Sequence, residues 1–135
     1  MTSSTLHLVE TKRGNAYESV VWRDSAVMPG VRYGVARISF GRRIELARRV
    51  HEIARKAEFL EAGSDAREKL EAVVIHAEAD RAYLETCLTA IEGLTIDGEI
   101  ATPENLIERG PIDLAAEILA AVKTECSLSG DERKN

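Results

Sequence analysis

The sequence predicts a mainly α-helical fold with a small N-terminal antiparallel β element, a long helical hairpin, a short β-hairpin and closing C-terminal helices. Aromatic residues make up only 4% of the 135 residues, whereas β-rich domains favour aromatic and β-branched residues. Two apolar patterns with helical spacing occupy the middle of the chain, and most extended patterns precede them. The length favours a single domain over residues 1–135. Its expected parts are a β element (1–38), a helical hairpin (39–93), a β-hairpin with closing helices (94–126) and a polar tail (127–135).

Residues 1–38 are expected to hold two or three short strands. Leu6–Glu10, Glu18–Arg23 and Val31–Ile38 are rich in Val, Tyr, Trp and Ile, and turn residues separate them. In the third segment apolar and other residues alternate, so that one face can pack on helices. Gly34 lies in the middle of this segment and either weakens the strand or marks a bulge.

A long helix is expected over Phe40–Ala62. Ser39 is a good N-cap, and Gly63 is the residue type favoured just beyond a helix C-terminus. Apolar residues recur four and three positions apart along one stripe, which other apolar residues widen. The stripe consists of Leu46, Val50, Ile53, Ala57 and Leu60, with Ile44, Ala47 and Ala54 beside it.

A second helix is expected to start at Ser64-Asp65 and to run to Gly93, completing an antiparallel hairpin with the first. Glu68 follows Asp65 in the spacing of a capping box. The same apolar spacing continues if Arg81 occupies one stripe position. Asp80 and Arg81 interrupt it, so the helix either bends there or Arg81 reaches a carboxylate in the core. The stripe consists of Leu70, Val74, Ala77, Leu84, Leu88 and Ile91, with Val73 and Cys87 beside it.

The last part of the chain predicts a small β-hairpin and two short helices. Asp97-Gly98 lies between two short apolar runs, which is a strong hairpin signal. Thr102 and Pro103 are typical of a helix start, and this helix is expected to end by Gly110-Pro111. A final helix is expected from about Pro111 to Cys126. Its apolar face consists of Leu114, Ile118, Leu119 and Val122.

Charge is unevenly distributed along the chain, whose net charge is -5. Residues 32–56 carry eight cations and two carboxylates, a net charge of +6, whereas residues 57–135 carry a net charge of -11. The basic helix can therefore face an acidic partner or the acidic part of the protein itself, and the simplest interpretation is a solvated helix face.

No catalytic residue, metal site or cofactor is predicted, and we do not expect an enzyme. His7, His51 and His76 have no His or Cys at metal-ligand spacing, although His76 and Asp80 share an i, i+4 relation. Cys87 and Cys126 are expected to be buried small hydrophobic residues. The N-terminus shows no export signal and the chain no membrane span, so a cytoplasmic protein is expected.

A family resemblance appears in four segments of the chain. The basic strand and capped helix start VRYGVARISFGRRIEL (Val31–Leu46) resembles the beginning of tail assembly chaperones of long-tailed bacteriophages and prophages. The segments Glu92–Glu99, Ala101–Ile107 and Cys126–Ser129 resemble the helix–hairpin–helix ending of such proteins. The resemblance spans about residues 18–135. It implies a non-enzymatic protein that binds and solubilises the helical tape-measure protein and helps to recruit tail-tube subunits.

The basic first helix and the strand before it are the predicted contact region for such partners. Helix-in-groove binding would shield the apolar stripe of a partner helix. The candidate partner-binding residues are Arg37, Phe40, Arg42, Arg43, Arg48 and Arg49.

The alternative is a small nucleic-acid-binding regulator that uses the basic helix 40–62, with Tyr33 or Phe40 as stacking residues. The acidic remainder of the chain and the lack of aromatic residues among the cations make nucleic acid the less favoured partner. For the large aromatic residues, packing in the core is favoured over lining a groove for a partner. These residues are Trp22, Tyr33, Phe40 and Phe59.

Overall fold

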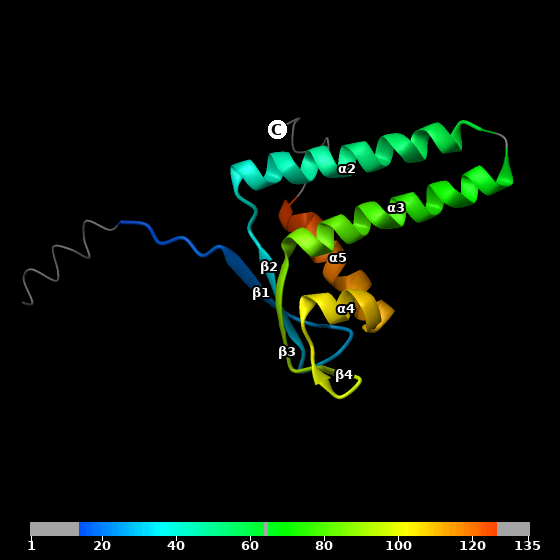
Figure 1. Ribbon diagram of the computed structural model, residues 1–135. Coiled ribbons are helices and arrows are strands. Elements are labelled where there is room, and N and C mark those ends of the chain that lie inside the picture. The colour runs from blue at the N-terminus through cyan, green and yellow to red at the C-terminus, as the bar shows by residue number, and fades with distance from the viewer. Residues whose placement is uncertain (1–13, 64, 127–135) are drawn as a thin grey trace, which may run out of the picture.

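The protein combines a helical hairpin with a small antiparallel sheet, a short β-hairpin and two closing helices, as predicted (Figure 1). The sheet has three strands, and the third follows the helical hairpin. The computed structural model describes residues 14–63 and 65–126. The predicted strand Leu6–Glu10, Ser64 and the polar tail 127–135 lie outside these residues. The elements in chain order are β1 (Val20–Asp24), β2 (Arg32–Ala36), α2 (Phe40–Glu61), α3 (Ala66–Cys87), β3 (Leu88–Glu92), β4 (Thr95–Ile96), β5 (Glu99–Ile100), α4 (Pro103–Arg109) and α5 (Ile112–Cys126).

The sheet has the strand order β1-β2-β3, with β2 in the centre. The pairing of β1 with β2 confirms the N-terminal β element. The pairing of β2 with β3 shifts register between Gly34 and Val35, where Thr89 of β3 is the extra residue, so a bulge in β3 lies opposite Gly34. A Cβ atom at Gly34 would lie 2.9 Å from Cγ1 of Val20 and 3.0 Å from Oγ1 of Thr89. Glycine therefore allows the strands on both sides of β2 to approach it closely.

The prediction that the second helix continues to Gly93 is wrong. Helix α3 ends at Cys87, and Leu88–Glu92 continues as strand β3. The spacing of Leu88 and Ile91 also fits a helical stripe. In the structure both residues belong to the strand and are buried, with 4% and 7% of their surface exposed. The edge of β2 favours a strand over a helix for Leu88–Glu92. Pairing with β3 satisfies backbone N–H and C=O groups of β2 that would otherwise have no partner in the sheet.

The hairpin of α2 and α3 begins as its capping residues predict. The Ser39 hydroxyl accepts a hydrogen bond from the Arg42 backbone N–H, and the Asp65 carboxylate accepts one from the Arg67 N–H. The α2 stripe is confirmed at Leu46 and Ala57, which are buried, whereas Ile44 is exposed.

The stripe predicted for α3 is only half correct. Its base, around Leu84, is buried, but Leu70 and Val74 in its outer half are exposed. The outer half instead buries Ala72, on the opposite side of the helix. Small residues thus form the contact with α2 there.

The C-terminal elements agree with their sequence signals. Asp97 and Gly98 both have positive φ values, of 51° and 82°, in the turn between β4 and β5. Thr102 and Asn105 form a reciprocal capping box at the start of α4. Helix α5 spans Ile112–Cys126 and buries Leu114, Ile118, Val122 and Cys126.

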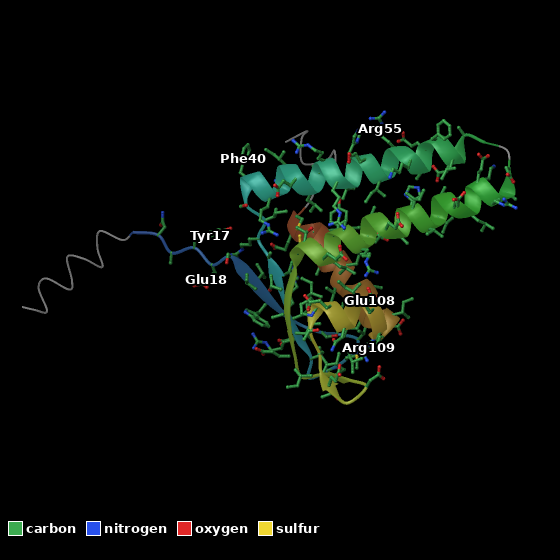
Figure 2. All side chains as sticks on the ribbon, in the orientation of Figure 1. Tyr17, Glu18, Phe40, Arg55, Glu108 and Arg109 are labelled. Carbon is green, nitrogen blue, oxygen red and sulfur yellow. The ribbon has the colours of Figure 1, made fainter. Side chains whose placement is uncertain are left out.

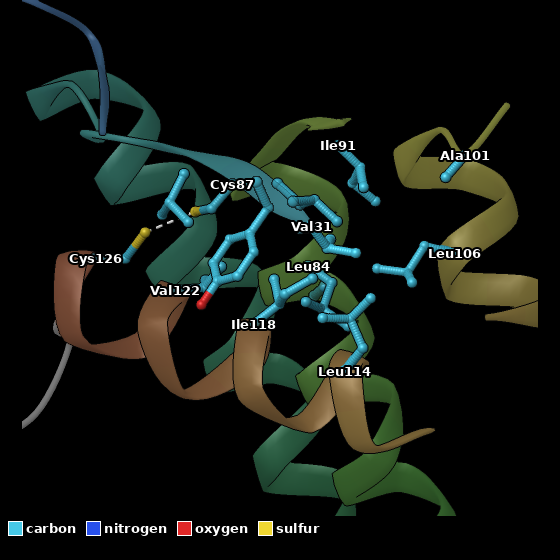
Figure 3. Close-up of a cluster of buried hydrophobic side chains, with 14 of the residues drawn as sticks. Val31, Leu84, Cys87, Ile91, Ala101, Leu106, Leu114, Ile118, Val122 and Cys126 are labelled. Carbon is cyan, nitrogen blue, oxygen red and sulfur yellow. Dashed lines mark hydrogen bonds between the residues drawn. The ribbon is translucent and has the colours of Figure 1, made fainter. Parts of the chain in front are cut away.

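The main core lies between the sheet, the base of α3 and α5 (Figure 3). Tyr33 is 3% exposed, which confirms it as a core residue, and both cysteines are buried as predicted. The outer part of the hairpin extends beyond α4 and α5 as an arm (Figure 1). The buried residues of this core include Val31, Val35, Leu84, Leu106, Leu114, Ile118 and Val122.

Candidate partner-binding surfaces

The six predicted contact residues lie at the end of β2 and in the first half of α2, and all are exposed. They do not form one continuous face, because residues of a helix share a face only at spacings of three or four. Phe40 and Arg48 lie on the outer side of α2, away from the Leu46 stripe, while Arg49 lies at the seam with α3. Arg37 donates a hydrogen bond to the Glu18 carbonyl oxygen at 2.8 Å.

Part of the basic helix faces the protein's own acidic part. Arg49 Nη2 lies 2.8 Å from Glu85 Oε1 on α3, and Arg81 Nε lies 2.9 Å from Glu85 Oε2. Arg81 also pairs with Glu108 on α4. The hydrogen bonds from Arg49 and Arg81 lower the pKa of Glu85 against the opposing effect of burial. This network joins α2, α3 and α4, so Arg49 has a structural role.

The network also decides the role of Arg81. One of the two expectations was that Arg81 reaches a carboxylate in the core. This expectation is wrong, because the Arg81 side chain is 46% exposed. It reaches carboxylates at the surface, where ion pairs add little stability individually. Arg81 interrupts the apolar stripe of α3 because it contacts α4 through charge.

The outer face of α2 combines apolar and basic side chains. Its members recur at spacings of four and seven, which places them on one side of the helix. Phe40 is 84% exposed and Phe59 is 78% exposed, so neither packs in the core. Figure 2 shows Arg55 projecting from α2 on the side away from α3. We call this the α2 outer face, and it consists of Phe40, Ile44, Arg48, Arg55 and Phe59.

A second exposed apolar surface lies on the other side of the arm. Leu70, Val73 and Val74 are 68%, 64% and 60% exposed. Helical spacing places Leu70 and Val74 opposite Ala72, which is buried against α2, and Val73 on the flank of the helix. Toward the base, the same side of α3 carries Leu84, which the core covers. We call Leu70, Val73, Val74 and Ala77 the α3 outer face. The sequence pattern predicts this apolar stripe, but it does not show that the outer half of the stripe is exposed to solvent.

His76 and Asp80, which share an i, i+4 relation, have separate partners. His76 Nε2 lies 3.1 Å from Glu61 Oε2 across the hairpin, whereas Asp80 Oδ1 lies 3.0 Å from Lys123 Nζ on α5. Within residues 14–63 and 65–126, no group of three or more His, Cys, Asp or Glu residues could hold a metal ion. In the same ranges, no helix is long and apolar enough to cross a membrane.

No protein-family model, curated protein or solved structure matches this chain.

Proposed function

We propose that this protein is a phage tail assembly chaperone that binds and solubilises the helical tape-measure protein and helps to recruit tail-tube subunits. The observation that supports this function is the helical arm, which exposes apolar side chains on two opposite faces. Exposed apolar surface of this kind is typical of protein-interaction sites. Amphipathic helices are the partners that such faces fit, through contacts at spacings of three and four residues.

The charges on the arm add a preference among such helices. Arg48 and Arg55 lie between Phe40 and Phe59 on the α2 outer face. A partner helix with acidic residues beside its apolar stripe would match both features, since complementary charge steers association and suppresses wrong partners. The acidic remainder of the chain would keep the complex in solution.

Co-expression with a tape-measure protein from the same genome tests the proposal. We expect the full chain to raise the soluble fraction of that protein and to co-purify with it. A combined Val73→Asp and Val74→Asp variant should lose this effect, because charge on the α3 outer face opposes apolar contact, while the free protein stays folded.

Ile112→Asp is the matched control, since Ile112 is 81% exposed but lies outside the arm. It should solubilise the partner as the unchanged protein does. Absence of co-purification with the unchanged chain would contradict the proposed function, and equal loss in the control would contradict the role of the arm.

A nucleic-acid-binding regulator is the second candidate, and the exposed arginines of α2 favour it. Phosphate contacts release counterions, so binding should be tightest at low salt and fall steeply as salt rises. The combined change Arg48→Gln and Arg55→Gln should then weaken binding and flatten this salt dependence. Fluorescence titration with DNA and RNA at about 50 mM salt tests this function, and absence of binding there rejects it.

A further inference from the structure

Two cysteines that lie far apart in the sequence meet in the core. Cys87 is the last residue of α3 and Cys126 is the last residue of α5. Their Sγ atoms lie 2.6 Å apart, and the residues are 0% and 1% exposed (Figure 3). The bond in a disulfide is about 2.05 Å long. Bonding would therefore require only a small movement of two side chains that already point at each other.

The two sulfur atoms differ in how readily they lose a proton. A hydrogen bond joins the two sulfur atoms, and either thiol can donate it. This bond lowers the pKa of Cys126 against the opposing effects of burial and of the Glu125 charge, while the charge of Arg43 assists. The same bond and burial raise the pKa of Cys87. Because the two sulfur atoms are in contact, a sulfenic acid formed on either one would lie next to the thiol that resolves it into a disulfide.

A metal is not needed to account for this pair. In the part of the chain that the structure describes, no third His, Cys, Asp or Glu joins the two cysteines in a metal-binding group. A structural zinc site uses four ligands. Two buried sulfur atoms in contact are instead the geometry of a dithiol that can be oxidised.

We propose that Cys87 and Cys126 are a modification site, which hydrogen peroxide converts into a reversible intramolecular disulfide. The Cys126 thiolate attacks one peroxide oxygen, the O–O bond breaks, and the departing oxygen takes up a proton to leave as water. The resulting sulfenic acid is attacked by the Cys87 sulfur. The S–O bond breaks, the S–S bond forms, and the Cys87 proton leaves with the hydroxide as a second water. Sulfur loses two electrons in total and the peroxide gains them.

The disulfide would fasten the C-terminal elements to the base of the arm. The two cysteines are separated by 39 positions, and the segment between them contains β3, β4, β5, α4 and α5. This segment supplies the residues that cover the inner half of α3. Closing a loop of this length restricts the unfolded chain, and it should lower the unfolding equilibrium constant by roughly several hundred-fold.

The experiment uses the full, reduced chain, which has two cysteines in all. The protein is treated with hydrogen peroxide, quenched in acid, denatured, and alkylated with N-ethylmaleimide before mass spectrometry. We expect a monomer that carries no maleimide, is lighter by two hydrogen atoms, and yields one peptide pair joined through Cys87 and Cys126. Its urea midpoint should rise, and dithiothreitol should restore both thiols and the original midpoint.

Three results would overturn the proposal: two maleimide adducts after peroxide treatment, a sulfinic acid without a disulfide, or a covalent dimer as the main product. A disulfide that leaves the urea midpoint unchanged would overturn the fastening role. In Cys87→Ala, peroxide should oxidise Cys126 without raising the midpoint. The experiment on the unchanged chain is sufficient to test the proposal, so the test does not depend on whether the Cys87→Ala variant folds.

Discussion

Individual residues fix the ends of the strands, and Gly93 is the clearest case. It follows β3 with a φ of +84°, in the left-handed region that glycine adopts without cost. A Cβ atom built on Gly93 would lie 2.2 Å from the carbonyl oxygen of Gly30. Because this neighbour is backbone in the turn before β2, neither segment can move away easily. Gly93 thus allows the end of β3 to pack against that turn.

We expect Gly93→Ala to destabilise the protein by about 2–4 kcal/mol, because strain at positive φ adds to the steric clash. Urea denaturation measures this loss. Gly41→Ala is the control, since Gly41 lies in α2 with nothing within 4 Å of the added Cβ. That change should stabilise the protein by about 0.5–1 kcal/mol. Equal effects of the two substitutions would contradict this account.

A single residue, Glu117, also joins α5 to the loop between β1 and β2. Its carboxylate accepts hydrogen bonds from the Ser25 hydroxyl at 2.6 Å and from the Ala26 N–H at 2.7 Å. Burial disfavours the charged form, but these hydrogen bonds, with one from the Val27 N–H, outweigh it and lower the pKa of Glu117. The ionised carboxylate therefore stabilises the folded state.

The Glu117→Gln substitution should cost roughly 1–2 kcal/mol at neutral pH. A carboxyl group whose pKa is lowered by folding contributes its full stabilisation of the folded state above its ordinary pKa of 4.5. This stabilisation disappears as pH falls through the lower pKa of the folded state. The difference in unfolding free energy between the unchanged protein and the Glu117→Gln variant should therefore disappear at acidic pH. Urea titrations from pH 7 to about pH 3 check this expectation. Glu78→Gln, at an exposed site on α3, is the control and should show no such gap.

Whole elements follow their local signals where those signals involve hydrogen bonds. In α4, the Asn105 N–H donates to the Thr102 hydroxyl at 3.1 Å, and the Thr102 N–H donates to the Asn105 side chain at 2.7 Å. Both bonds are local, so the start of α4 could be predicted from the sequence. The boundary between α3 and β3 could not, because it depends on the edge of β2, which is distant in the sequence.

Thr102→Ala should destabilise the protein by about 1 kcal/mol through loss of the α4 cap. The control is Thr124→Ala. The Thr124 hydroxyl donates to the Ala120 carbonyl oxygen within α5, so this change should alter stability by less than about 0.5 kcal/mol. Thermal unfolding of both variants distinguishes a cap from an ordinary helical position, and a smaller loss at Thr102 would contradict the capping role.

At the scale of the whole molecule, the arm and the core differ in how they are held together. The base of α3 contacts α4, α5 and β3, whereas the outer arm relies on contacts between α2 and α3. Those contacts involve small side chains such as Ala57 and Ala72, both 0% exposed. Small residues allow close approach but bury little apolar area, so the arm gains less free energy from packing than the core does.

Native-state hydrogen exchange should reveal this difference. Amides of the outer arm, within residues 52–63 and 65–77, should open with a lower free energy than those of the base of α3 and of α5, because fewer buried contacts hold them. The Ala82–Cys87 segment serves as the internal reference, since the core covers it. Equal protection along the whole of α3 would contradict the distinction between arm and core.

The sequence by itself determined the helical hairpin, the short hairpin of β4 and β5, the capped starts of α2, α3 and α4, and an irregularity of the sheet at Gly34. Each depends on residues close in the chain or on a regular apolar period. Tertiary structure alone decided that Leu88–Glu92 is a strand, that Leu70 and Val74 stay exposed, and that Cys87 meets Cys126. An apolar stripe specifies that a surface is available for packing, but distant elements decide which part of it is covered.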